Sequence, residues 1–113
     1  MKNFTELDEI IAVSPQIEAS DIADIAAAGF KSIICNRPDG ESGDQTPYSV
    51  IEAAAQATSI PIRNIPVVSG AITIDNVRDM KAALAELPKP VFAYCRSGAR
   101  CTNLYALVQN LDA

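Results

Sequence analysis

Residues 91–101, VFAYCRSGARC, carry the pattern that decides both the fold and the site. An apolar run ends at Cys95, and two arginines and a glycine follow before Cys101. The run is typical of a buried strand, and apolar residues at helical spacing from Leu104 to Leu111 predict a helix soon after it. The chain therefore passes from a strand to a helix through a short loop that begins with a cysteine.

The same alternation of short β-branched runs and alanine-rich stretches extends along the chain. Strands are predicted at residues 10–14, 30–36, 60–67 and 91–94. Helices are predicted to start near Ser20 or Asp21, at Thr46, at Thr73 or Asp75, and at Ala99 or Arg100. This order predicts an α/β fold, with a short, mostly parallel sheet of about four strands and helices on both faces. We expect one domain over residues 1–113.

The composition favours a compact globular domain and disfavours several partners. Hydrophobic residues make up 49% and charged residues 20%, and the formal net charge is −5. A negative chain is a poor ligand for nucleic acid or for an anionic membrane surface. No apolar run approaches the ~20 residues that a membrane span requires, and residues 1–10 lack the apolar core of a secretory signal.

The residue types that are scarce limit the chemistry. The three cysteines have no metal-ligand spacing, so we expect free thiols in a reducing cytoplasm. The chain has no histidine, which removes the commonest general base and the commonest zinc ligand. We therefore expect no metal or other cofactor, and catalysis that depends on cysteine, carboxylates, arginine or backbone groups.

The loop after Cys95 has the features of an anion-binding site around a thiolate. In a parallel sheet, ligands bind at the carboxyl ends of the strands, where Cys95 follows the last strand. Backbone N–H groups at a helix start and two arginines favour a negative charge, so Cys95 is predicted to be a thiolate nucleophile. The residues expected to bind the anion are Arg96, Ser97, Gly98, Ala99 and Arg100.

Three segments, SPQIEASDIADIAAAGFKSIICNRPDGE, IPV and VFAYCRSGAR, resemble the phosphatase-like domain of the beta-lactamase-hydrolase-like family. The resemblance extends from about Val13 to Leu107. Members of this family occur alone or fused to a metallo-hydrolase domain, and have been described both as phosphatases and as sulfur transferases. The resemblance implies the fold of dual-specificity phosphatases, with the nucleophilic cysteine at the edge of the sheet.

The length of the loop favours sulfur over phosphorus. Cysteine phosphatases use the pattern C-x5-R, in which the arginine binds two phosphate oxygens. In this chain that position is Cys101, and the arginine stands one place earlier, at Arg100. The shorter loop resembles the rhodanese pattern C-R-x-G-x-[RT], which surrounds a persulfide.

The carboxylates near the loop give the same preference. A phosphatase normally protonates its leaving group, but residues 67–70, where the resemblance implies the acid, hold no carboxylate. Asp75 is an alternative acid or a helix cap, and Asp39 is an acid or a turn residue, with Glu41 in the same loop. Tyr94 stands where phosphatases often have histidine. Sulfur transfer expels a thiolate or sulfite and needs no acid.

The remaining cysteines and Arg37 each have two interpretations. Cys101 is either a resolving or sulfur-accepting thiol for Cys95 or a small buried residue. Cys35 is predicted to be a core residue of the second strand, although that strand ends at the same edge. Arg37 either adds positive charge to the anion site or is solvated.

Together these patterns predict a small cytoplasmic sulfurtransferase on a phosphatase-like scaffold, with Cys95 as nucleophile and persulfide carrier. A cysteine phosphatase that uses the same Cys95 and Arg100 is the first alternative, and a thiol redox or persulfide sensor is the second. The expected substrate is a small anion (a persulfide, thiosulfate or a phosphate ester), with an acceptor protein thiol as the second partner.

Overall fold

The computed structural model describes residues 4–111 and contains one five-stranded sheet. The strands are β1 (Thr5–Glu6), β2 (Ile11–Ser14), β3 (Ser32–Cys35), β4 (Ile62–Asn64) and β5 (Val91–Tyr94). They lie in the order β1-β2-β5-β3-β4, and all neighbouring pairs are parallel except β1 with β2. The predicted α/β fold is confirmed. The two exposed residues of β1 were missed because they carry no hydrophobic pattern.

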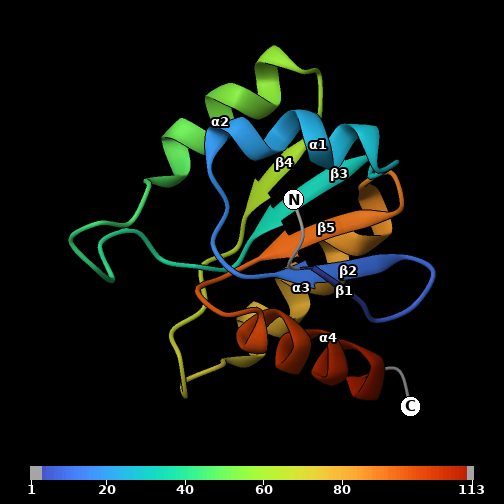
Figure 1. Cartoon of the computed structure of the whole chain (residues 1–113). Coiled ribbons are helices and arrows are strands. Elements are labelled where there is room, and N and C mark those ends of the chain that lie inside the picture. Colours follow the sequence, from blue (N-terminus) through green and yellow to red (C-terminus); the bar gives the residue numbers. More distant parts are fainter. Residues whose placement is uncertain (1–3, 112–113) are drawn as a thin grey trace.

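Helices cover both faces of the sheet, as predicted. They are the 3-10 turn η1 (Ala19–Asp21), α1 (Ile22–Ala27), α2 (Tyr48–Ala57), α3 (Ile74–Glu86) and α4 (Ala99–Leu111). Figure 1 shows α1 and α2 on one face and α3 and α4 on the other. At the start of α3, the Thr73 side chain accepts a hydrogen bond from the Asn76 backbone, so Thr73 and not Asp75 is the cap.

Alternation along the buried strands divides the hydrophobic core into two parts. In β5, Val91 and Ala93 face the layer of α3 and α4, whereas Phe92 and Tyr94 face the layer of α1 and α2. All four residues are buried, because the central strand of a covered parallel sheet contacts helices on both sides. The direction of each side chain at the end of β5 is therefore fixed by its place in this alternation.

The carboxyl ends of β2, β3 and β5 meet at one edge of the sheet. The Cys95 amide donates to the Ser14 carbonyl at 3.2 Å, and the Asn36 amide donates to the Tyr94 carbonyl at 2.8 Å. These bonds continue the sheet by one residue beyond the strands, so the segments that follow β3 and β5 begin side by side at this edge. The predicted loop of the site, which starts at Cys95, begins at this edge.

Two further predictions concern the chain as a whole. The predicted domain covered residues 1–113, of which 1–3 and 112–113 lie outside the described residues. Within residues 4–111, no helix is both long and apolar enough to cross a lipid bilayer.

Candidate active site

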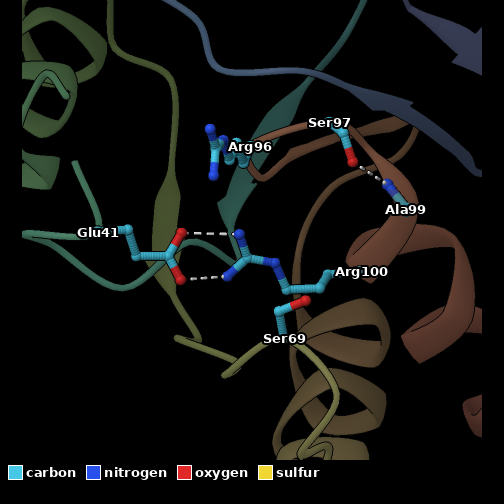
Figure 2. A pocket seen from close by; sticks show the side chains of 6 residues that line it. All are labelled: Glu41, Ser69, Arg96, Ser97, Ala99 and Arg100. Carbon is cyan, nitrogen blue, oxygen red and sulfur yellow. Dashed lines mark hydrogen bonds and ion pairs between the residues drawn. The ribbon is translucent and has the colours of Figure 1, made fainter. Parts of the chain in front are cut away.

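The loop from Cys95 to Arg100 joins β5 to α4 and closes tightly on itself. Gly98 has a φ of 93°, in the region that favours glycine, and its backbone lies against that of Ser14. The Ser97 hydroxyl accepts from the Ala99 amide at 3.3 Å, and the Gly98 carbonyl accepts from the Thr102 amide at 3.1 Å. The loop therefore turns directly into the first turn of α4 (Figure 2).

Cys95 lies at the base of this loop, where its sulfur is stabilised as a thiolate. The Gly98 amide donates to the Cys95 Sγ at 3.0 Å. The Cys101 thiol, followed by the backbone N–H groups of Cys101, Ser97 and Gly98, lowers the pKa of Cys95 to about 5, despite its burial. Cys95 is therefore mostly ionised at neutral pH, and thiolates are the reactive form of cysteine.

Arg100 extends from the first turn of α4 with its guanidinium held on two sides. Its Nη1 donates to the Val67 carbonyl at 2.9 Å. Its Nη1 and Nη2 also donate to the two carboxylate oxygens of Glu41, at 2.6 and 2.7 Å (Figure 2). Arg100 is buried and makes a two-pronged ion pair, which is the arrangement by which arginine binds carboxylates and phosphates.

Glu41 is also bound by a second buried arginine, Arg37. The Arg37 Nε donates to the Glu41 carboxylate at 3.0 Å, and its other nitrogens donate to Gln16 at 3.0 Å and Ser42 at 3.3 Å. The interpretation of Arg37 as a solvated residue is wrong, because only 4% of its side chain is exposed. Arg100 and Arg37 together hold the pKa of Glu41 below its usual value, so Glu41 is a carboxylate at neutral pH.

A cavity of about 360 Å³ opens over the loop. It is lined by Glu41, Ser69, Arg96, Ser97, Ala99 and Arg100. Four of these belong to the loop after Cys95, and Arg96 and Arg100 supply its positive charge. Of the predicted anion-binding residues, Arg96, Ser97, Ala99 and Arg100 therefore line one cavity, which has room for a small anion, whereas Gly98 does not line it.

The two aspartates considered as proton donors lie elsewhere. The Asp39 carboxylate accepts from the Tyr48 amide at 2.8 Å and so binds the start of α2. Asp75 is exposed in the first turn of α3. Neither residue lines the cavity; of the carboxylates considered from the sequence, Glu41 is the one that does.

The other two thiols differ in their relation to Cys95. Cys101 is buried in α4, and its thiol interacts directly with Cys95. Cys35 is buried in the opposite core layer, as is Tyr94, so neither side chain faces the loop. All three cysteines are free thiols.

Sequence reasoning missed the groups that hold Arg100 in place. The Val67 carbonyl, which accepts from Arg100, and Ser69, which lines the cavity, belong to the segment that was searched only for a carboxylate. Arg37 was considered for its charge alone, not as a buried partner of Glu41. An arginine directly after a buried strand at the edge that binds ligands was the available signal for its role.

Comparisons with known proteins identify the family of this chain. The family model for the phosphatase-like domain of beta-lactamase hydrolase-like proteins matches residues 3–112. A beta-lactamase hydrolase-like protein of Agrobacterium fabrum is 37% identical over 106 residues, which cover 94% of this chain. The chain spans only 25% of that relative's length, about a quarter.

Several solved structures of phosphatases are similar to this chain. A candidate phosphatase of Neisseria meningitidis has a TM-score of 0.82 and 35% identity, and the match covers 88% of this chain and 71% of that one. The catalytic core of a PP-IP phosphatase of S. cerevisiae, solved with citrate, has a TM-score of 0.73 and 17% identity, with coverage of 97% and 66%. These findings support the phosphatase alternative better than the preference for sulfur transfer.

Proposed function

This chain belongs to the phosphatase-like domain family of the beta-lactamase hydrolase-like proteins, and on that basis we propose that it is a cysteine-dependent phosphatase. Cys95 is the nucleophile, and Arg100 with the loop residues from Arg96 to Ala99 binds the phosphoryl group. The observation that carries the proposal is the buried Cys95, whose sulfur accepts from the Gly98 amide and has a pKa of about 5, at the start of a loop whose two arginines line a cavity.

The reaction proceeds in two displacements on phosphorus. The Cys95 sulfur forms a bond to phosphorus while the bond to the ester oxygen breaks, and the alkoxide or phenoxide leaves with the electron pair and takes a proton from water. Water then attacks the phosphocysteine, which releases inorganic phosphate and restores the thiolate. Loop N–H groups and the Arg100 guanidinium stabilise the charge on the equatorial oxygens in both steps.

The site favours esters with good leaving groups. Asp39 and Asp75 do not line the cavity, and Glu41 is ionised by its two arginines, so none of the three is placed as a proton donor. A phenoxide leaves without protonation more readily than an alkoxide. We therefore expect aryl phosphates to be hydrolysed faster than alkyl phosphates.

Hydrolysis of p-nitrophenyl phosphate tests the proposal. The wild-type protein should release p-nitrophenol, and Arg100→Lys should lower kcat/KM by about 10- to 100-fold, because lysine keeps the charge but loses the two-pronged geometry. Lys89→Arg, on a residue outside the cavity, is the control and should change little. Lack of turnover on aryl phosphates by the folded wild-type protein would refute the proposal.

Sulfane-sulfur transfer is the second candidate, and the position of Arg100 favours it. The arginine is the fifth residue after Cys95, which shortens the loop by one residue relative to C-x5-R. Cys95 would attack the outer sulfur of a persulfide or thiosulfate, expel a thiolate or sulfite, and pass the sulfur to an acceptor thiol. Thiosulfate-dependent thiocyanate formation from cyanide, measured on the same preparation, separates the two candidates.

A further inference from the structure

The Glu41 carboxylate occupies the position on Arg100 that an oxyanion substrate needs. Its two oxygens lie 2.6 and 2.7 Å from Nη1 and Nη2 of Arg100. Two parallel charge-assisted bonds of this kind are also how arginine binds two oxygens of a phosphoryl group. In Figure 2 the Glu41 carboxylate meets the guanidinium end-on within the lining of the cavity.

The bonds to Glu41 and Val67 use both N–H groups of Arg100 Nη1 and one N–H group of Nη2. Nη1 already donates to the Val67 carbonyl at 2.9 Å, and only 10% of the side chain is exposed. A phosphoryl dianion that reached Arg100 beside Glu41 would also meet a like charge at close range. Substrate and Glu41 therefore compete for the positive charge of Arg100.

Arg37 can keep the Glu41 carboxylate in an ion pair after Glu41 leaves Arg100. Its Nε donates to Glu41 at 3.0 Å, and its own position is fixed by Gln16 and Ser42. Glu41 can therefore leave Arg100 and keep its ion pair with Arg37. The Glu41 side chain is 23% exposed and lies beside Gly40, which has a positive φ of 79°, within a loop that contains turns.

We propose that Glu41 is an internal substrate mimic that determines which anions this site accepts. A ligand with a singly charged carboxylate would replace the Glu41 carboxylate on Arg100 with a group of the same charge, so it would gain little. A doubly charged phosphoryl group gains more from Arg96, Arg100 and the loop N–H groups, so it displaces Glu41. Glu41 thereby raises the concentration of substrate that the site requires and selects for dianions. This inference rests on the proposed function for its substrate class.

Calorimetric titration with inorganic phosphate tests the inference without requiring turnover. Glu41→Gln removes the competing charge and should tighten phosphate binding about 10- to 100-fold, the value of a charge-assisted hydrogen bond pair. The same variant should lower the KM for p-nitrophenyl phosphate. Asp44→Asn is the matched control: it removes one charge from the same loop, where Asp44 bonds to Ser42, and should shift binding less than about twofold.

Unchanged or weaker phosphate binding in a folded Glu41→Gln protein would overturn the inference, as would an equal gain in Asp44→Asn. If Glu41→Gln does not fold, carbon-13 NMR of the wild-type protein replaces it. The carboxyl resonance of Glu41 should then move on saturation with phosphate while that of Asp44 stays, and a stationary Glu41 resonance would contradict the inference. Tighter phosphate binding by Glu41→Gln without any phosphatase turnover would refute the proposed function and leave this inference standing.

Discussion

Cys95 and Cys35 lie at the ends of neighbouring parallel strands, yet their thiols have opposite tendencies to ionise. Cys35 is the last residue of β3, and burial raises the pKa of its thiol, which donates to the Arg37 carbonyl at 3.4 Å. Cys95 is the first residue after β5, and the pKa of its thiol falls to about 5. Both residues are buried, with at most 2% of their surface exposed.

The difference comes from what faces each sulfur. Cys35 points into the layer of α1 and α2, where burial outweighs the hydrogen bonds of the Tyr94 side chain and the Arg37 backbone, so the pKa of its thiol is raised. Cys95 points into the opposite layer, where the loop before α4 directs N–H groups and the Cys101 thiol at its sulfur. A position at the carboxyl edge of the sheet is therefore not enough to stabilise a thiolate. The hydrogen-bond donors of the following loop are also required.

The largest expected effect separates the two cysteines by activity. Cys95→Ala should lower aryl phosphatase kcat by about a thousandfold or more, since it removes the nucleophile. Cys35→Ala removes one sulfur from the apolar layer and should keep kcat within about threefold of wild type. Steady-state rates of the two purified variants check this, with circular dichroism to show that both fold. Equal losses of kcat in both variants would show that Cys95 has no role in the reaction that Cys35 lacks.

A smaller effect concerns Cys101, whose thiol contributes most to the low pKa of Cys95. Because the thiolate is the active form, kcat/KM should be constant above about pH 6 and fall as the pH drops through about 5. Cys101→Ala removes the donor, so the fall in kcat/KM at low pH should move to higher pH, with roughly tenfold less activity near pH 6. Cys101→Ser keeps an O–H donor and should retain the wild-type profile. Superimposable profiles for the two variants would show that the Cys101 thiol does not stabilise the thiolate.

The smallest expected effect concerns the backbone of the loop. Gly98→Ala should lower the free energy of unfolding by about 1 kcal/mol, because its φ of 93° is unfavourable for a residue with a Cβ. Gly43→Ala is the control, since Gly43 has no positive φ and a Cβ there would meet no atom within 4 Å. Urea unfolding of both variants measures the difference. If Gly98→Ala were as stable as Gly43→Ala, the loop would not depend on this glycine.

The sequence was most informative where the controlling interactions are local. The run from Val91 to Cys101 shows a strand, a loop and a helix start within a few residues, so their order and the place of Cys95 could be predicted. Thr73 and Asp75 are both good capping residues, and the choice between them depended on geometry that spacing does not reveal.

Contacts between distant segments could not be predicted in the same way. Glu41 and Arg100 are 59 residues apart, and nothing in either local pattern indicates that they form an ion pair. The number of residues from Cys95 to Arg100 favoured sulfur transfer. That number does not determine where the Arg100 guanidinium lies in the site. In the structure Arg100 lines the same cavity as the rest of the loop despite the missing residue.

Mass spectrometry of the protein quenched in acid during turnover of an aryl phosphate tests the central claim most directly. We expect a phosphoryl group on the sulfur of Cys95, mapped to the peptide that contains it and absent from Cys95→Ala. A parallel incubation with a persulfide donor gives the comparison. No phosphoryl adduct with the phosphate ester, together with an added sulfur on Cys95 from the persulfide donor, would contradict the claim and assign the site to sulfur transfer.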